Sequence, residues 1–272
     1  MDEKVKSEVI CFALALVFLL ASGCKGREGS GTVVAEEAEE EPLPERYEND
    51  DLPKAADELF DDFAYYFASN EGLQRRRIAF PLKVNGTDVE EQEWQMDPLF
   101  MTAGEYVRIF DSAEQRELAN DTTIAHVTIE NIKMTADSVR QYLFDRSEGR
   151  WQLTAVKDIT MHEMPYAKFL DFYQDFATDS AFQQASLNSE IAFSSPDPDD
   201  DFATLEGFIT PDSWEAFAPE LPHDNIYNIV YGKQDKRAKK KVFVVCGISN
   251  GLEMELTFQQ KRGRWKLMRI EN

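Results

Sequence analysis

Three short patterns occur twice in this chain of 272 residues, and the duplication constrains the fold more than any other feature. The first is a set of helix-spaced phenylalanines, the second an Ile-Ala-Phe tripeptide and the third a Gly-Arg-Trp-x-Leu motif. They begin at Phe60, Ile78 and Gly149, and again at Phe169, Ile191 and Gly263. Because ordered recurrence at nearly constant spacing indicates an internal repeat, the sequence predicts two domains, at residues 54–161 and 162–272.

Each predicted copy opens with helices. The phenylalanines stand at i, i+3 and i+7, so they share one face of a helix, with acidic residues opposite. In the first copy those acidic residues are Glu58, Asp61 and Asp62. A second short helix is expected over 71–76 and, in the second copy, over 181–187.

Strands complete each copy. Apolar and polar residues alternate in Gly251–Gln260, which is typical of a sheet with one buried and one solvated face. Glycine-containing turns at 147–149 and 261–263 predict hairpins. In Ile124–Met134 the alternation slips by one residue, which predicts a β-bulge.

The N-terminus has the layout of a secretory signal. Two lysines precede a short apolar run, Ile10–Cys24, which is too short to span a bilayer as a permanent helix. Its ending, Leu-Ala-Ser-Gly-Cys, resembles a bacterial lipobox. That resemblance implies removal of residues 1–23 and acylation of Cys24, which would anchor the chain in the membrane. The alternative is a plain secretory signal with an incidental cysteine.

Residues 24–53 have the composition of a flexible tether, because they combine a glutamate-rich block with prolines. We expect a spacer, with an acidic docking motif as the alternative. Some Bacteroidota lipoproteins carry an acidic export tag directly after the cysteine, and Lys25–Glu28 does not match it. The expected location is therefore the periplasmic side of the outer membrane.

The order of elements in each copy resembles the nuclear-transport-factor-two-like fold, the cystatin-like α+β cone. The tandem arrangement behind a lipoprotein signal also resembles an uncharacterised family of Bacteroidota envelope lipoproteins. The resemblance covers residues 54–272. It implies an α+β fold of two repeated cone domains, each with N-terminal helices packed on a curved antiparallel sheet. Members of this fold class often pair through their sheets, so the expected state is a monomer that acts as an internal pseudo-dimer.

Composition narrows the possible partners. The net charge of −22 argues against nucleic acid, whose phosphates need a basic surface, and leaves membrane contact to the lipid anchor. Nineteen phenylalanines supply a packed core. Apart from Cys24, the mature chain keeps only Cys246, so no internal disulfide is expected. Its β-branched surroundings favour a core position over a nucleophilic one.

No catalytic, cofactor or metal site is predicted. The resemblance implies an Asp or His in an apolar cavity with an acidic or tyrosine partner, and no set of residues matches that pattern. His126 is on a predicted strand and faces either a cavity or solvent, whereas His162 and His223 lie in connections. The acidic loop Asp197–Asp201 lacks the glycine and distal glutamate of a calcium loop, so we expect a solvated loop.

Two basic clusters and four modification motifs remain. Arg75–Arg77 and Lys236–Lys241 could grip phosphate or carboxylate groups of an envelope glycan or lipid, or serve as a helix end and a solvated turn. Asp followed by Ser or Thr and a small or aliphatic residue resembles the Bacteroidota O-glycosylation pattern. The candidate sites are Ser112, Thr122, Ser138 and Ser180.

These observations favour a non-enzymatic envelope lipoprotein that binds a ligand or an envelope partner through its tandem domains. One alternative is an isomerase, dehydratase or hydrolase that uses one domain cavity, in which case one copy should hold a buried titratable pair with apolar walls that the other has lost. The other alternative is a structural scaffold of an outer-membrane assembly.

The lipobox resemblance gives the first prediction. Replacing the acylated thiol with a hydroxyl, Cys24→Ser, should abolish incorporation of labelled palmitate and move the protein from the membrane to the soluble envelope fraction. Cys246→Ser is the matched control and should keep both the label and the membrane association. Label retained by Cys24→Ser would contradict the assignment.

Overall fold

The computed structural model describes residue 57 and residues 59–197 and 199–272, without the side chain of Asp201. The signal, Cys24, the tether and Glu58 lie outside the described residues. Four α-helices are present in the described part: α1 (Phe60–Ser69), α2 (Glu71–Arg76), α3 (Ala167–Thr178) and α4 (Ser180–Ala185). Twelve strands accompany them: β1 (Ile78–Val84), β2 (Thr87–Val89), β3 (Glu105–Phe110), β4 (His126–Lys133), β5 (Ser138–Ser147), β6 (Arg150–Thr160), β7 (Leu187–Asp197), β8 (Asp200–Ile209), β9 (Asn225–Tyr231), β10 (Lys240–Gly247), β11 (Glu253–Lys261) and β12 (Arg264–Glu271).

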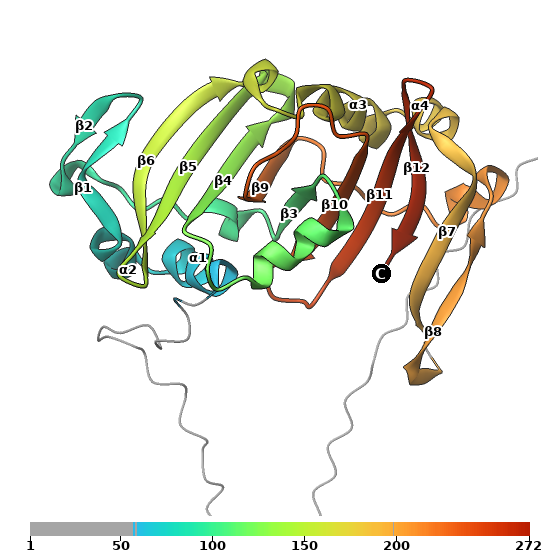
Figure 1. The fold of residues 1–272 in the computed structure, drawn as a ribbon, viewed down its shortest axis with the longest axis horizontal. Helices are drawn as coiled ribbons and strands as arrows, with labels where there is room; N and C mark the ends of the chain where they lie inside the picture. Colours follow the sequence, from blue (N-terminus) through green and yellow to red (C-terminus); the bar gives the residue numbers. More distant parts are fainter. Residues whose placement is uncertain (1–56, 58, 198) are drawn as a thin grey trace, which may run out of the picture. The chain divides into compact units, whose positions relative to one another are not determined.

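All twelve strands belong to one mixed sheet, in the order β2-β1-β6-β5-β4-β9-β3-β10-β11-β12-β7-β8 (Figure 1). At its centre the strands of the two predicted domains interleave. β9, from the predicted second domain, pairs with β4 of the first. β3, from the predicted first domain, pairs with β10 of the second. The sheet therefore continues across the predicted boundary at residue 161, and all described residues belong to one compact unit.

Two hydrophobic cores lie on opposite faces of this sheet. In β10 the buried residues Val242, Val244 and Cys246 belong to the core that contains α1, whereas Phe243 and Val245 belong to the core that contains α3. Because successive side chains of a strand point to opposite faces, α1 and α3 must cover different faces of the central strands. Burial on both faces explains the unbroken apolar run of β10.

The same two-sided burial corrects the bulge predicted in Ile124–Met134. The pairing of β4 with β5 and with β9 shows no register shift, so the prediction of a bulge is wrong. Val127 and Ile129 face the core of α1, and Ile132 and Met134 face the core of α3. The apolar pattern slips because the strand passes from one core to the other.

Other local predictions are confirmed. Helices α2 and α4 lie close to the expected positions, and Met254, Leu256 and Phe258 of β11 are buried. The alternation fails at two positions, because Leu252 precedes β11 and is exposed, and Glu255 is buried beside Arg116. Both predicted hairpin turns place two successive residues at positive φ, Glu148 and Gly149 at 52° and 77°, and Arg262 and Gly263 at 50° and 80°. These are the torsions of a two-residue turn that matches strand twist.

One contact outside the repeated motifs also occurs twice. Gln74 accepts a hydrogen bond from Trp94 Nε1 (3.1 Å), and Gln183 accepts one from Trp214 Nε1 (2.8 Å). Both glutamines donate to a main-chain oxygen seven residues earlier, at 3.1 Å. Trp94 therefore occupies the place of Trp214, although no repeated sequence pattern links the two.

The pairing of β1 and β7 with their neighbours does not align the two Ile-Ala-Phe tripeptides with each other. Ile78 pairs with Leu153 and Leu187 pairs with Leu267, which places these two residues at corresponding points of the parallel pairings. By the same spacing, the residue of β1 that corresponds to Ile191 is Leu82, and both side chains are fully buried. The helix spacing of 109 residues thus continues into these strands.

The junction between β3 and β9 depends on side chains. The two strands run parallel, and their single register pair joins Val107 to Asn228. The fully buried Asn228 side chain adds a hydrogen bond, because its Oδ1 accepts from the backbone N of Ile109 at 3.1 Å. Its Nδ2 donates to Glu130 Oε2 (3.0 Å) and to Tyr166 Oη (2.7 Å).

This junction gives the second prediction. Asn228→Leu removes the acceptor of a buried N–H and one donor to a buried carboxylate, so the free energy of unfolding should fall by about 3 kcal/mol. Urea unfolding measures the loss. Asn120→Leu, at an exposed asparagine, should change stability by less than about 0.5 kcal/mol. Equal effects of the two substitutions would contradict the role of Asn228.

Candidate functional site

Asp61 of α1 is the centre of the strongest candidate site. It was expected on a solvated helix face, but it continues the buried small-residue row of Ala64 and Ala68 toward the sheet. Its side chain is 26% exposed. Tyr231 of β9 donates a hydrogen bond to its Oδ1, and Arg108 Nη1 of β3 lies 3.4 Å from its Oδ2.

Arg108 connects this carboxylate to a row of ion pairs on β11. Arg108 Nη2 lies 2.8 Å from Glu253 Oε2. Arg116 then bridges Glu253 at 2.7 Å and Glu255 at 2.5 Å. Three carboxylates thus share two guanidinium groups, and the row retains one uncompensated negative charge.

An open pocket of about 200 Å³ lies beside Asp61. This volume corresponds to roughly seven water molecules at ~30 Å³ each. Two neighbouring carboxylates and several apolar or aromatic groups line it: Asp61, Asp62, Tyr65, Phe100, Tyr106, Ile229, Gly247 and Ile248. The residues come from α1, from the central strands β3, β9 and β10, and from two connections.

Burial perturbs the titration of the groups around the pocket. It raises the pKa of Asp61 above its ordinary value, against the opposing effects of Arg108 and of the Tyr231 hydrogen bond. Asp62 and Glu253 also raise this pKa by charge repulsion. Burial likewise raises the pKa of Tyr106 and brings that of Cys246 to about 11, so the Cys246 thiol stays protonated at neutral pH. The expected core position of Cys246 is confirmed.

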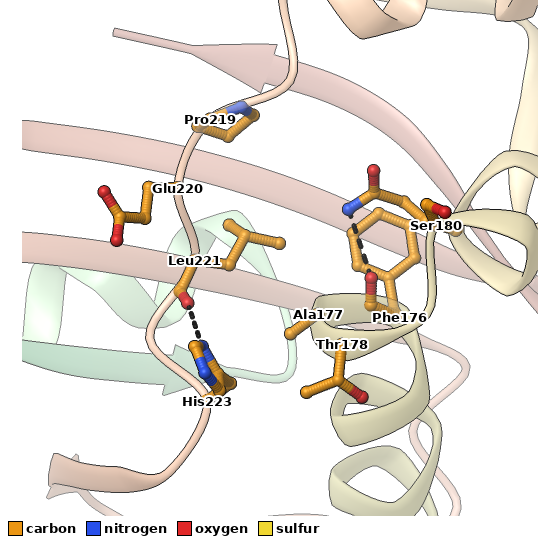
Figure 2. Close-up of a pocket in the computed structure, with 9 residues that line it drawn as sticks. Phe176, Ala177, Thr178, Ser180, Pro219, Glu220, Leu221 and His223 are labelled. Atoms are coloured by element: carbon orange, nitrogen blue, oxygen red, sulfur yellow. Dashed lines mark hydrogen bonds between the residues drawn. The ribbon is translucent and has the colours of Figure 1, made fainter.

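A second pocket, of about 280 Å³, lies between the end of α3 and the connection that precedes β9 (Figure 2). Figure 2 shows His223 and Leu221 opposite Ala177 and Thr178. His223 Nδ1 contacts the backbone oxygen of Leu221 at 2.9 Å, and the Thr178 hydroxyl donates to the backbone oxygen of Gln174 at 2.7 Å. Within the described residues this pocket therefore holds no nucleophile hydrogen-bonded to the histidine.

The structure separates the histidines considered from sequence. The His126 side chain is 82% exposed and contacts Asp145, so it faces solvent and not a cavity. His162 is exposed and lies 3.7 Å from Asp137. The described residues contain no group of three or more His, Cys, Asp or Glu side chains placed to hold a metal ion.

The Arg75–Arg77 cluster is largely tied into the fold. Arg75 lies 3.1 Å from Glu71 and donates to the backbone oxygens of Glu91 and Trp94. Arg77 forms a two-pronged ion pair with Asp57, with both distances 2.7 Å.

In the second cluster Lys241 is buried and pairs with Asp111, whereas Lys236 and Arg237 are exposed. In the acidic loop, Asp197 and Asp200 accept hydrogen bonds from nearby backbone N–H groups, whereas Pro198 and the side chain of Asp201 lie outside the described part.

The modification candidates differ in accessibility. Thr122 and Ser180 are exposed, whereas Ser112 and Ser138 are half-buried. Within the described residues no helix is both long and apolar enough to cross a membrane.

A cleft larger than the two pockets above was not predicted from the sequence. Its volume is about 620 Å³, and it lies at the β11–β12 hairpin beside the start of β7. Four basic side chains line it: Lys261, Arg262, Arg264 and Lys266. They are dispersed through the Gly-Arg-Trp motif and the turn before it, so they do not form a continuous basic run in the sequence.

The Asp61 site gives the third prediction. Because its raised pKa reflects a disfavoured charged form, the stability of the folded state should fall as pH rises through that pKa. Asp61→Asn cannot ionise, so it should gain stability relative to the native protein between about pH 4 and pH 7. Urea midpoints across that range measure the difference. Tyr231→Phe removes a hydrogen bond that lowers this pKa, so the decline should continue to higher pH, whereas a difference independent of pH would contradict the prediction.

Comparison with known proteins shows the family to which this chain belongs. The family described as a domain of unknown function (DUF4348) matches residues 39–272. The structure is similar to the crystal structure of an NTF2-like protein from Bacteroides fragilis, with 39% sequence identity and a TM-score of 0.73 over 81% of this chain and 98% of the other. No curated protein matches the chain. The expected NTF2-like α+β fold is confirmed, and the chain belongs to the DUF4348 family.

Proposed function

We propose that this protein is a non-enzymatic lipoprotein of the cell envelope that binds a small organic cation in the Asp61 pocket. The observation that carries the proposal is the combination of two adjacent carboxylates with aromatic walls, from Tyr65, Phe100 and Tyr106. Carboxylates attract a cation, and aromatic faces add cation–π attraction. The anchor would be Cys24, on the periplasmic side of the outer membrane.

The surrounding charges favour the same class of ligand. Asp61, Glu253 and Glu255 share only the guanidinium groups of Arg108 and Arg116, and the exposed Asp62 adds a further negative charge at the pocket. A bound cation would offset this excess. It would also favour the ionised form of Asp61, so binding should strengthen as pH rises through the pKa of that carboxyl.

The packing of the first core favours binding over catalysis. Phe60, Phe63, Phe67, Phe144 and Trp151 are all at most 1% exposed and fill the space between α1 and the sheet. The remaining pocket is small and open to solvent, and Asp61 already accepts a hydrogen bond from Tyr231. A catalytic base commonly needs a more enclosed site and a free lone pair directed at its substrate.

The tandem arrangement is part of the proposal. Two copies of one cone motif would have exchanged their third strands, so that β9 completes the first copy and β3 the second. The recurring glutamine–tryptophan bond and the matching registers of β1 and β7 support this duplication. A chain built in this way would act as a monomeric pseudo-dimer, with no second subunit needed to cover the central strands.

A small-molecule enzyme is the second candidate function. In favour of it, Asp61 is a partly buried acid beside apolar walls, whereas its counterpart 109 residues later is the fully buried Leu170. Retention of a titratable group in only one copy is what catalysis in one cavity requires. In that case Asp61→Asn would abolish turnover of a ligand while leaving its binding intact.

Benzylamine is a suitable probe because it joins an ammonium group to an aromatic ring. In the fourth prediction, titration of the full chain with benzylamine shifts the methyl NMR signals of Ile229 and Ile248, which line the pocket. Asp61→Asn should weaken binding by about fivefold or more, since it removes the charge that faces the ammonium.

The matched control is Asp171→Asn, which removes an exposed carboxylate of α3 outside the pocket. It should leave the affinity within about twofold of the native value. Binding that is unchanged in Asp61→Asn, or signal shifts confined to other parts of the protein, would contradict a cation site at Asp61.

A further inference from the structure

The cleft at the β11–β12 hairpin has a charge opposite to that of the whole molecule. Lys261, Arg262, Arg264 and Lys266 line it together with Leu187, Asn188 and Ser189 of β7, and no carboxylate does. The chain as a whole carries a net charge of −22. Four cations in one cleft of such a chain indicate a local requirement for positive charge.

Contacts with neutral groups position two of these cations. Lys266 Nζ lies 2.5 Å from the backbone oxygen of Ala185, at the end of α4, and 3.3 Å from that of Leu187. Lys261 Nζ donates to Asn188 Oδ1 at 3.1 Å. Among the described residues, no carboxylate pairs with any of the four cations, so their charge is not neutralised within this part of the chain.

The hairpin between β5 and β6 shows that the turn itself does not require these cations. Glu148 and Gly149 adopt nearly the same torsions as Arg262 and Gly263. The two hairpins align at a spacing of 114 residues. Of the four cations, one has a basic counterpart, since Arg264 corresponds to Arg150. The other three, Lys261, Arg262 and Lys266, correspond to Ser147, Glu148 and Gln152. The β5–β6 hairpin therefore adopts the same turn with one cation at these four positions instead of four.

We propose that this cleft binds a sugar-sized organic anion that carries at least two phosphate groups. The volume of about 620 Å³ corresponds to roughly twenty water molecules, enough for a phosphorylated mono- or disaccharide. Arg262 and Arg264 can each present a forked guanidinium to one phosphate, and Lys261 supplies a further charge. The exposed Ser189 supplies a hydroxyl for hydrogen bonds to the sugar, and Asn188, which accepts from Lys261 and donates to the backbone oxygen of Glu190, holds that lysine at the cleft. This site is separate from the Asp61 pocket and does not rest on the cation proposal.

The fifth prediction replaces two cleft residues with the residues found at the same positions of the β5–β6 turn. In the double variant Lys261→Ser/Arg262→Glu, both positions receive their counterparts from the β5–β6 hairpin, so the turn should be preserved. The control Lys236→Ser/Arg237→Glu makes the same change of net charge in the β9–β10 connection, where both residues are exposed. Calorimetric titration of the full chain at low salt would use fructose 1,6-bisphosphate and inorganic pyrophosphate as probes. Vesicles containing phosphatidate form a third arm.

The cleft variant should bind fructose 1,6-bisphosphate at least about tenfold more weakly than the native protein, while the control stays within about twofold. Tighter binding to phosphatidate vesicles than to the soluble probes would assign the cleft to a lipid headgroup with one phosphate and would overturn the proposal of a sugar with two phosphates. Equal weakening in both variants would show a general charge effect and overturn the proposal. Failure of the native protein to bind any of the three probes would also overturn it.

Discussion

The organisation of this protein depends on the junction of β3 and β9 at the centre of the sheet. Parallel pairing supplies only one register pair there, so buried side chains must complete the hydrogen bonding. Asn228 does so by satisfying the N–H of Ile109 and by donating to Glu130. Glu130 also accepts hydrogen bonds from Tyr166 and Gln141, yet burial still raises its pKa. A network of this kind stabilises the fold only while each member keeps its partners.

The position of the ligand-sized spaces follows from this junction. Since the central strands are covered on both faces, their apolar side chains fill two cores among the described residues. The charged groups of the two candidate sites lie at the edges of these cores. Asp61 lies at one flank of α1, and the basic cleft lies at the end of a hairpin. Both pockets are open to solvent, so the binding proposed at each depends on charge rather than on enclosure.

Much of the local structure could be predicted from sequence, because periodicity reports directly on which face of an element is buried. The phenylalanines that predicted α1 and α3 are buried in the two cores, and the glycine turns formed as expected. The pairing of β9 with β4 and of β3 with β10 was not predictable, since the sequence of an apolar strand does not identify its partner strand. The slip between Ile129 and Ile132 did signal burial on two faces, but an isolated pattern of this kind also fits a bulge.

The site residues were missed for a related reason. Asp61 belongs to a helix whose acidic residues all read as solvated, and only its place in a row with Ala64 and Ala68 distinguishes it. Arg262 was assigned only to a hairpin turn, because the adjacent glycine predicts a turn whatever the charge of its neighbour. Comparison of the two halves separates these roles, because the positions that recur maintain the fold, as Gln74 and Gln183 do. Positions that have diverged, Asp61 against Leu170 and Arg262 against Glu148, are free of that constraint. The other half is built without the charges of Asp61, Lys261, Arg262 and Lys266, and this difference is what supports the two proposed ligand sites.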